Sequence, residues 1–491
     1  MLAATPQWAT ACLPLAQAAL DLARSLGASY ADVRCVERLV DTVATRDGRP
    51  EGTTTDLSRG FGVRVLLGGA WGFASSSQLT RAEVERVTRM AIATAKASAT
   101  VAGRPVSLGP PLVVQGRYET PLQEDPFQVP VETKLAILME AESAMRAVPG
   151  VRVTSGVITC QRETKLFLSS EGSYLEQVLT ETGCGIEATA VGETEVQTRS
   201  YPNSFGRHQA TRGYEMVREL DLPGHATRIA EEAAALLRAD PCPSTVTTLI
   251  LDPTQLALQI HESIGHAIEL DRVLGYEAAF AGTSFLNPGM RESFQYASPI
   301  VTVSADATLP GGLGTFGWDD EGVPAQRVPI IEAGRFTGFL SCRETAAQLG
   351  LPSGGMARAD NWNRIPMVRM TNVNLEPGSG TLADIIADTD DGIYMHTNRS
   401  WSIDDKRVNF QFGAQIAWEV KRGRLGRMLK NPTYTGITPI FWAGCDAIAG
   451  ASEWQIWGTP NCGKGQPMQV AHVGHGASPA RFRQVQVGLA R

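Results

Sequence analysis

The chain has 491 residues, of which 43% are hydrophobic and 19% are charged, and its net charge is −7. This composition is typical of a soluble globular protein and argues against disorder, and the length exceeds what one hydrophobic core usually serves. The acidic balance provides no basic surface for nucleic acid or anionic membranes, and no apolar run has the length of a membrane span. We therefore expect neither partner.

The N-terminus and the cysteines point to one compartment. Residues 1–7 carry no positive charge ahead of a mildly apolar stretch, which argues against a secretory signal. Eight cysteines scattered over so long a chain do not suggest a disulfide framework. We expect a cytoplasmic protein whose thiols stay reduced and available to a metal.

The first half of the chain alternates helical and strand patterns. Apolar residues at helical spacing predict a helix over 13–26. Two glycines between 61–67 and 70–75 predict a β-hairpin. Thr80 and Glu83 form a capping-box pattern for a helix that runs to about residue 97. The remaining patterns predict helices over 131–147 and 226–237 and strands over 151–159, 165–169 and 174–181.

A proline-rich break separates this half from the next. The segment DPCPS at 240–244 ends the helical pattern, and we place a domain boundary there. Short β-type runs follow, separated by Gly, Pro and Asp turns: 300–303, 328–331, 335–341, 407–417 and 437–442. We predict an α+β protein with an N-terminal mixed helix/sheet domain (1–240) and a mostly antiparallel β C-terminal domain (245–491).

The C-terminal domain begins with an unusual helix. Residues 249–251 have strand character, Asp252 is in the position of an N-cap, and Pro253 suits the first helical turn. Two turns later the segment HESIGH places His261, Glu262 and His266 within six residues. Two histidines that hold a metal, with a glutamate that takes a proton from metal-bound water, are typical of zinc hydrolases.

The spacing of the histidines differs from the usual HExxH by one residue. Five residues at about 100° each leave the two rings roughly 140° apart on an ideal helix, too far round to share an ion. If both bind, the helix must widen locally as in a π-bulge, a distortion common at functional sites. Gly265 would lower the cost of that distortion.

Zinc needs a third protein ligand, and several residues could supply it. Cys462 lies among small and turn-forming residues, and neighbouring Lys464 favours its thiolate. Glu269 could be a ligand, an outer partner or an exposed helix carboxylate, and His396 is an outside candidate. The roles of His472 and His475, in a glycine-rich tail, remain open.

Four polar residues are weaker candidates for substrate binding. Asp319 and Asp320 could bind a hard cation or form a hydrogen-bonded acidic turn. Arg369 and Asn372 could bind a peptide backbone or terminus, or serve the structure alone.

Four segments in this order form a recognisable set: HESIGH at 261–266, DDEG at 319–322, RMTN at 369–372 and NCGK at 461–464. Together with residues 62–74 they resemble the TldD branch of the TldD/PmbA family of metallopeptidases, over nearly the whole chain. The resemblance implies that His261, His266 and Cys462 bind zinc and that Glu262 is catalytic. The chain departs from the family at AHVGHG (471–476), where a run of small apolar residues is usual.

The leading hypothesis is a zinc-dependent peptidase that acts on flexible peptides or unfolded segments. The resemblance implies a heterodimer with a non-catalytic family relative, with a homodimer as the alternative. Other hypotheses are a non-catalytic scaffold subunit with a structural zinc and a zinc amidase acting on small molecules. Retention of Glu262 and Gly265 between the ligands argues against the scaffold, because a structural zinc needs no base.

Overall fold

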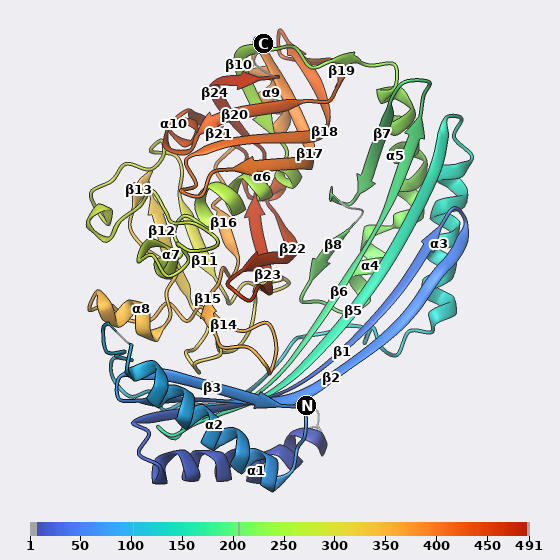
Figure 1. The fold of residues 1–491 in the computed structure, drawn as a ribbon. Helices are drawn as coiled ribbons and strands as arrows, with labels where there is room; N and C mark the ends of the chain where they lie inside the picture. Colours follow the sequence, from blue (N-terminus) through green and yellow to red (C-terminus); the bar gives the residue numbers. More distant parts are fainter. Residues whose placement is uncertain (1–6, 102, 205–206, 489–491) are drawn as a thin grey trace.

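The computed structural model of the chain describes residues 7–101, 103–204 and 207–488. Residues 1–6, which make up most of the N-terminal segment used above to argue against a secretory signal, lie outside the described residues. The first half forms a long curved sheet with helices on its outer side, and the second half packs against the inner side (Figure 1). No described helix is long and apolar enough to span a membrane.

The N-terminal sheet has the strand order β3-β2-β1-β5-β6-β4, and β7 and β8 also pair with β6. All neighbouring pairs are antiparallel except β4 and β6. The strands are β1 Tyr30–Arg46, β2 Arg49–Leu67, β3 Ala70–Ser76, β4 Gln115–Glu119, β5 Val151–Ser169, β6 Tyr174–Val191, β7 Val196–Tyr201 and β8 His208–Ala210.

Two groups of helices cover this sheet. Apolar residues of α1 and α2 form one core with β1, β2, β3 and β5, and those of α3, α4 and α5 form another with β5 and β6. At the start of α2, the Thr80 hydroxyl accepts the Glu83 N–H at 3.3 Å, as predicted, whereas the Glu83 carboxylate pairs with Arg86. The helices are α1 Gln7–Ser25, α2 Arg81–Ala99, α3 Val131–Arg146, α4 Glu215–Leu220 and α5 Leu222–Leu236.

The predicted hairpin at 61–67 and 70–75 is confirmed, but the strands are longer than predicted. The two runs at 151–159 and 165–169 form one strand, β5, and β1 was not predicted at all. The reason lies in buried charge: Asp32 and Arg34 on β1 are fully buried, and Asp32 pairs with Arg64 of β2 at 2.7 Å. Both lie on one face of β1, opposite Val33 and Cys35, and charged residues at alternate positions usually mark an exposed face and not a strand buried on both sides.

The second half contains a second large sheet with the order β17-β10-β24-β20-β18-β19-β9, in which β17 also pairs with β18, and β21 pairs with β24. Its pairs are antiparallel except β10–β17 and β9–β19, so the predicted α+β class with a mostly antiparallel second half is confirmed. Its strands are β9 Asp240–Pro241, β10 Thr245–Leu251, β17 Asp391–Ile403, β18 Asn409–Lys421, β19 Arg424–Lys430, β20 Thr433–Ile437, β21 Cys445–Ile448 and β24 Ala480–Val487.

Smaller sheets complete this half. One has the order β13-β12-β11-β16, and β14–β15 and β22–β23 are two-stranded. These strands are β11 Val303–Asp306, β12 Arg327–Glu332, β13 Arg335–Phe336, β14 Ala357–Arg358, β15 Met367–Val368, β16 Val373–Leu375, β22 Gln455–Lys464 and β23 Gln469–Ala477. The helices are α6 Pro253–Ile260, α7 Leu270–Val273, α8 Arg343–Gln348, α9 Leu382–Ala387 and α10 Thr438–Ala443.

Three predicted strands need correction. The run 437–442 is helix α10, because β20 ends at Ile437 and Pro439 occupies the first helical turn, where no N–H is needed. The run 335–341 is a strand only at β13, and the run 300–303 joins a strand only at its last residue. Short apolar runs do not distinguish strands from buried irregular segments.

Candidate metal centre

The HESIGH segment is mounted on a rigid strand and helix. β10 lies inside the large sheet and leads into α6, where the Asp252 carboxylate accepts the Thr254 N–H at 2.9 Å. After α6 the backbone widens into a π-helical turn over His261–Gly265, and the His266 N–H donates to the His261 carbonyl at 3.1 Å. The predicted widening of the helix is confirmed, and it brings both histidine rings to one side.

Packing against Met370 requires a glycine at position 265, although its φ lies outside the left-handed region. A Cβ placed on this glycine would lie 2.3 Å from Sδ of Met370, which is itself fully buried. The π-helical turn therefore lies closer to the Met370 side chain than any other residue would allow.

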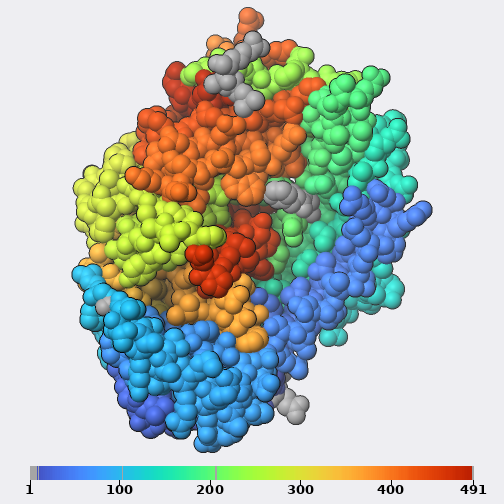
Figure 2. All heavy atoms as spheres, in the orientation of Figure 1, coloured from blue at the N-terminus to red at the C-terminus, as the bar shows by residue number. Residues whose placement is uncertain are grey.

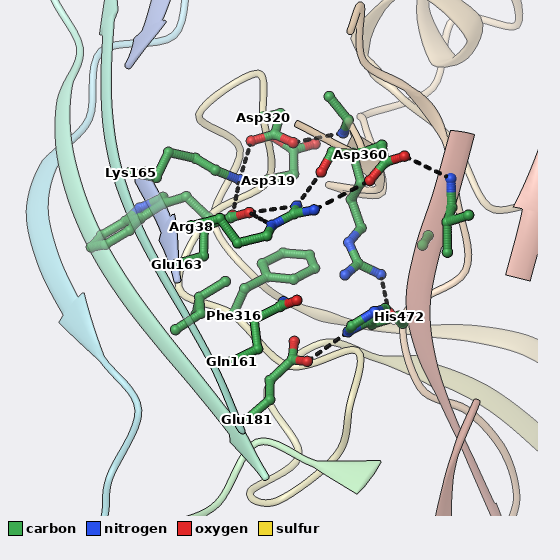
Figure 3. A pocket seen from close by; sticks show the side chains of 16 residues that line it. Arg38, Gln161, Glu163, Lys165, Glu181, Phe316, Asp319, Asp320, Asp360 and His472 are labelled. Carbon is green, nitrogen blue, oxygen red and sulfur yellow. Dashed lines mark hydrogen bonds and ion pairs between the residues drawn. The ribbon is translucent and has the colours of Figure 1, made fainter. Parts of the chain in front are cut away.

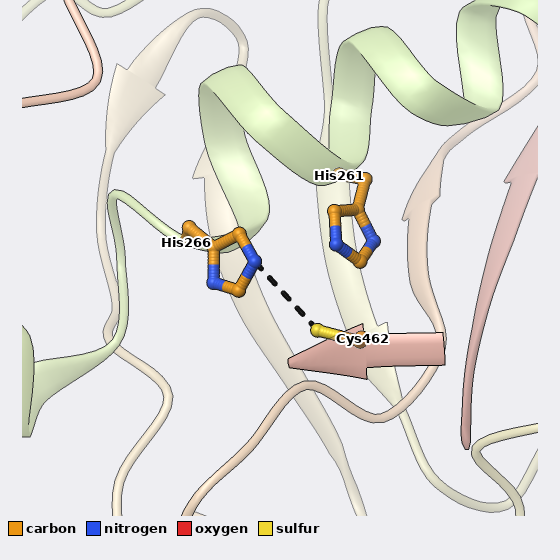
Figure 4. A group of neighbouring side chains, drawn as sticks. All are labelled: His261, His266 and Cys462. Atoms are coloured by element: carbon orange, nitrogen blue, oxygen red, sulfur yellow. Dashed lines mark hydrogen bonds between the residues drawn. The ribbon is translucent and has the colours of Figure 1, made fainter. Parts of the chain in front are cut away.

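The structure brings Cys462 to the two histidines across almost 200 residues of sequence. The candidate ligand atoms of His261, His266 and Cys462 all lie within 4.8 Å of one another, and all three residues are buried. Figure 4 shows both rings below the helix, facing the thiol on β22, and Cys462 Sγ lies 3.6 Å from His266 Nε2. Two imidazoles and a thiol at this separation form a donor set that suits zinc.

The electrostatic surroundings favour the protonation states that a metal requires. Burial lowers the pKa of both histidines, which keeps the imidazoles neutral. Burial opposes ionisation of the Cys462 thiol, but Arg369 and His266 outweigh it and hold its pKa below the ordinary value. Lys464, the residue expected to act on the thiol, instead contacts Asp271 at 2.7 Å and Glu269 at 3.3 Å.

Glu269 is an inner partner of the site and not an exposed helix carboxylate. It is fully buried at the N-terminus of α7, and its Oε2 lies 2.9 Å from His266 Nδ1. Burial opposes ionisation of Glu269, yet Lys464 and His266 hold its pKa well below the usual range. The resulting carboxylate can accept a hydrogen bond from His266.

The other histidines take different places. His475 is fully buried, and its Nε2 lies 2.7 Å from His261 Nδ1. His472, on the same strand, instead contacts Glu181 of the N-terminal sheet at 2.5 Å. His396 lies 3.5 Å from Asp252, and among the described residues it does not join the cluster of candidate ligands.

Sequence reasoning missed Arg407. Its Nη1 donates to Glu262 Oε2 at 2.6 Å, so the carboxylate proposed as a base is paired with a guanidinium. Arg407 lies in the turn between β17 and β18, about 145 residues along the chain, where the sequence had suggested only the start of a strand. No local signal in the sequence links the two residues, because the register of the β17–β18 hairpin brings them together.

A cavity of about 450 Å³ opens onto the three candidate ligands and Glu262. Its wall is formed by α6, by the C-terminal end of β17 and the turn after it, by residues 458–463 of β22, and by Asn203, Ser204 and Arg207 between β7 and β8. Figure 2 shows the surface hollowed beside the red β22–β23 segment, below the orange strands. The site is therefore buried yet open to a ligand.

The four weaker candidates lie elsewhere. Asp319 and Asp320 line a separate cavity of about 60 Å³ at the contact with the N-terminal sheet, where Asp320 binds Lys165 at 2.6 Å (Figure 3). Arg369 donates to the backbone carbonyl groups of Cys462 and Gln469.

The fourth, Asn372, is also engaged inside the protein. Its side chain bonds to the backbone of Asp306 and Gly314 and to the Thr315 hydroxyl. None of the four lines the cavity that holds the histidines. Their interactions support the structure around the site.

Three domain models of one protein family match most of the chain. Residues 244–488 match the PmbA/TldA metallopeptidase C-terminal domain, residues 31–95 match domain 1, and residues 124–239 match the central domain. A metalloprotease of Methanothermobacter thermautotrophicus is 30% identical over 94% of this chain and 95% of its own. The chain belongs to the PmbA/TldD metallopeptidase family.

Two further relatives extend the comparison. A zinc metalloprotease TldD homolog of Saccharolobus solfataricus is 22% identical over 95% of this chain and 98% of its own. The crystal structure of TldE from Thermococcus kodakarensis, 17% identical, covers 97% of this chain and 100% of its own with a TM-score of 0.72. At that identity the likeness shows the shared fold.

Proposed function

We propose that this protein is a zinc-dependent peptidase that hydrolyses flexible peptides or unfolded protein segments. The observation that carries the proposal is the convergence of His261, His266 and Cys462 within 4.8 Å beside an open cavity that Glu262 also lines. Three protein donors with a fourth side open are the arrangement of catalytic zinc sites, whereas structural sites are closed by a fourth protein ligand.

Each residue of the centre has a separate task in this proposal. His261, His266 and Cys462 hold the metal, which when bound supplies Lewis acidity toward a carbonyl group and a water molecule. Glu262 takes a proton from the attacking water and passes it to the leaving amine. Arg407 orients the Glu262 carboxylate through its hydrogen bond at 2.6 Å.

The shape of the cavity supports an extended substrate. β22 belongs to a two-stranded sheet with β23, and its residues 458–463 line the cavity. Within this segment, the Gly458 N–H donates to His208 and the Cys462 carbonyl accepts from Arg369, so a peptide would meet only the remaining backbone groups. Contacts with backbone groups do not demand particular side chains of the substrate. We infer that the substrate lies along this segment, with its scissile bond near the three ligands.

We further propose that the working assembly contains a second chain of the same family. The partner would be a non-catalytic relative, or a second copy of this chain, that covers the cavity. Such a cover would admit only extended chains and would protect folded proteins from a peptidase of low sequence selectivity.

Glu262→Gln tests the reaction, because glutamine preserves the shape and removes the base. The variant should bind zinc as the parent does and cleave an unstructured peptide about 10²–10⁴-fold more slowly. Glu292→Gln, at an exposed glutamate paired with Arg291, is the matched control and should cleave normally. Near-normal turnover by Glu262→Gln would contradict the proposed role, and a zinc-loaded parent that cuts no peptide would favour a scaffold.

A further inference from the structure

His475 lies between the candidate ligand His261 and a backbone carbonyl group, and it is hydrogen-bonded to both. Its ring is fully buried on β23, its Nε2 lies 2.7 Å from His261 Nδ1, and its Nδ1 lies 3.2 Å from the backbone carbonyl oxygen of Val373 on β16. The two rings meet nearly at right angles, at 80°, with their centroids 4.8 Å apart. Both nitrogen atoms of His475 are therefore engaged by fixed partners.

The Val373 carbonyl decides where the protons lie. A carbonyl oxygen can only accept, so Nδ1 of His475 carries the hydrogen and donates it. A neutral imidazole has one N–H, so Nε2 of His475 is bare and must accept from its neighbour. That neighbour is Nδ1 of His261, which leaves Nε2 of His261 as the nitrogen with a free lone pair.

His266 reaches the same state by a different route. Its Nδ1 faces the Glu269 carboxylate at 2.9 Å, and its Nε2 faces the Cys462 thiol at 3.6 Å. A carboxylate accepts the Nδ1 hydrogen directly, so Nε2 is again the bare nitrogen. The two histidines thus present the same atom toward Cys462, one held by a carboxylate and the other by a neutral histidine.

We propose that His475 is a positioning residue of the metal centre, which fixes the His261 tautomer with Nδ1–H and presents Nε2 to the metal. The inference rests on the metal site of the proposed function and deepens it. A neutral partner adds no negative charge beyond those of the Cys462 thiolate and Glu269. Charge on the ligands weakens a metal as a Lewis acid, so a neutral second partner suits hydrolysis.

Two substitutions separate positioning from other roles. The amide oxygen of Gln in His475→Gln can reach the place of Nε2 and accept the His261 hydrogen. The shorter amide of Asn in His475→Asn reaches only the place of Nδ1 and leaves that hydrogen without an acceptor. His475→Met, whose flexible apolar side chain carries only a weakly accepting thioether, replaces the Asn variant if the zinc-free Asn variant unfolds at a much lower temperature than the zinc-free parent.

The measurement is zinc affinity of the purified full chain by competition with a chromophoric chelator, together with the absorption spectrum of the cobalt-substituted protein. We expect His475→Gln to keep parental affinity and spectrum, and His475→Asn or His475→Met to lose about 10–100-fold in affinity. His472→Asn, on the same strand but paired with Glu181, is the matched control and should bind zinc as the parent does.

Three outcomes would decide against the inference. Parental affinity in His475→Asn and His475→Met would show that His261 needs no positioning partner. A loss in His475→Gln as large as in His475→Asn, with a changed cobalt spectrum, would identify His475 as a metal ligand itself. Failure of the parent to bind zinc would overturn both proposals, whereas the expected affinities without peptide cleavage would leave this inference standing and remove only the peptidase.

Discussion

Arg407 donates a hydrogen bond from Nη1 to Oε2 of Glu262 at 2.6 Å, and this pair joins the β17–β18 turn to the π-helical turn. Arg407 has a left-handed backbone, with φ at 65°, and its Nε is buried without a hydrogen-bond partner in the described part of the chain. Such strain persists where the surrounding structure demands it, often at functional sites. The hairpin therefore delivers a fixed positive charge to the carboxylate proposed as the base.

Replacement of Arg407 should lower turnover more than zinc binding. Arg407→Met removes the charge, and a hydrogen bond between charged groups contributes about 1.5–3 kcal/mol, so kcat should fall about 10–100-fold. Arg407→Lys should recover part of the loss. The matched control is Arg427→Met, at an exposed arginine of the same sheet. Steady-state kinetics and zinc analysis of each variant test this role. An Arg407→Met variant with the kcat of the parent would contradict it.

Cys462 should be the thiol on which the metal depends. Purified protein should carry about one zinc per chain, and Cys462→Ser should lose most of it, because a serine hydroxyl is not ionised at neutral pH as the thiolate is. Cys445→Ser provides the comparison: this thiol is equally buried, but burial raises its pKa and it lies outside the cluster of ligands. Full zinc occupancy in Cys462→Ser, measured by elemental analysis, would remove Cys462 from the ligand set.

The close approach of Gly265 and Met370 predicts a coupled pair of substitutions. Gly265→Ala should destabilise the protein by about 1–3 kcal/mol, because the new methyl group would collide with the Met370 sulfur. Met370→Ala alone should cost about 2–5 kcal/mol by leaving a cavity. The double variant should lose less free energy of unfolding than the sum of the two single losses, since the new methyl group occupies part of the space that Met370 leaves. Additive losses in chemical denaturation would show that a methyl group at position 265 does not meet the Met370 side chain.

Assembly and substrate folding should be linked. If a second chain covers the cavity, the active form should be a dimer with an interface well above the ~1,600 Å² of a standard complex. The same peptide should then be cut much faster when it is free than when it is part of a stable folded domain. Light scattering of the same enzyme sample gives its oligomeric state. A fully active monomer that cuts the folded substrate as fast as the free peptide would refute this model of access.

Much of the candidate site could be predicted from the sequence because its elements are local. HESIGH lies within two helical turns, and its spacing predicted a π-helical turn if His261 and His266 bind one ion; the structure has this turn. The N-cap at Asp252 and the hairpin at residues 61–75 were likewise set by neighbouring residues. The family resemblance selected Cys462 as the third candidate ligand, and the structure places its thiol 3.6 Å from His266 Nε2.

Other features could not be read from local pattern. Strand β1 was missed because its buried charges, Asp32 and Arg34, find partners on β2 and on the second half of the chain. The run at 437–442 was misread because one proline and a few apolar residues suit either a strand end or a buried helix start.

By itself the sequence determined which candidate donors this protein holds, the wide helical turn that two of them would need to share an ion, and an α+β chain with a β-rich second half. Only the tertiary structure decided which groups serve those donors, namely His475 for His261, Glu269 for His266 and Arg407 for Glu262. The physical reason is the distance along the chain between the residues that interact. Helix geometry is set by neighbours along the chain, whereas contacts such as that of His261 with His475 depend on how distant strands pair and pack.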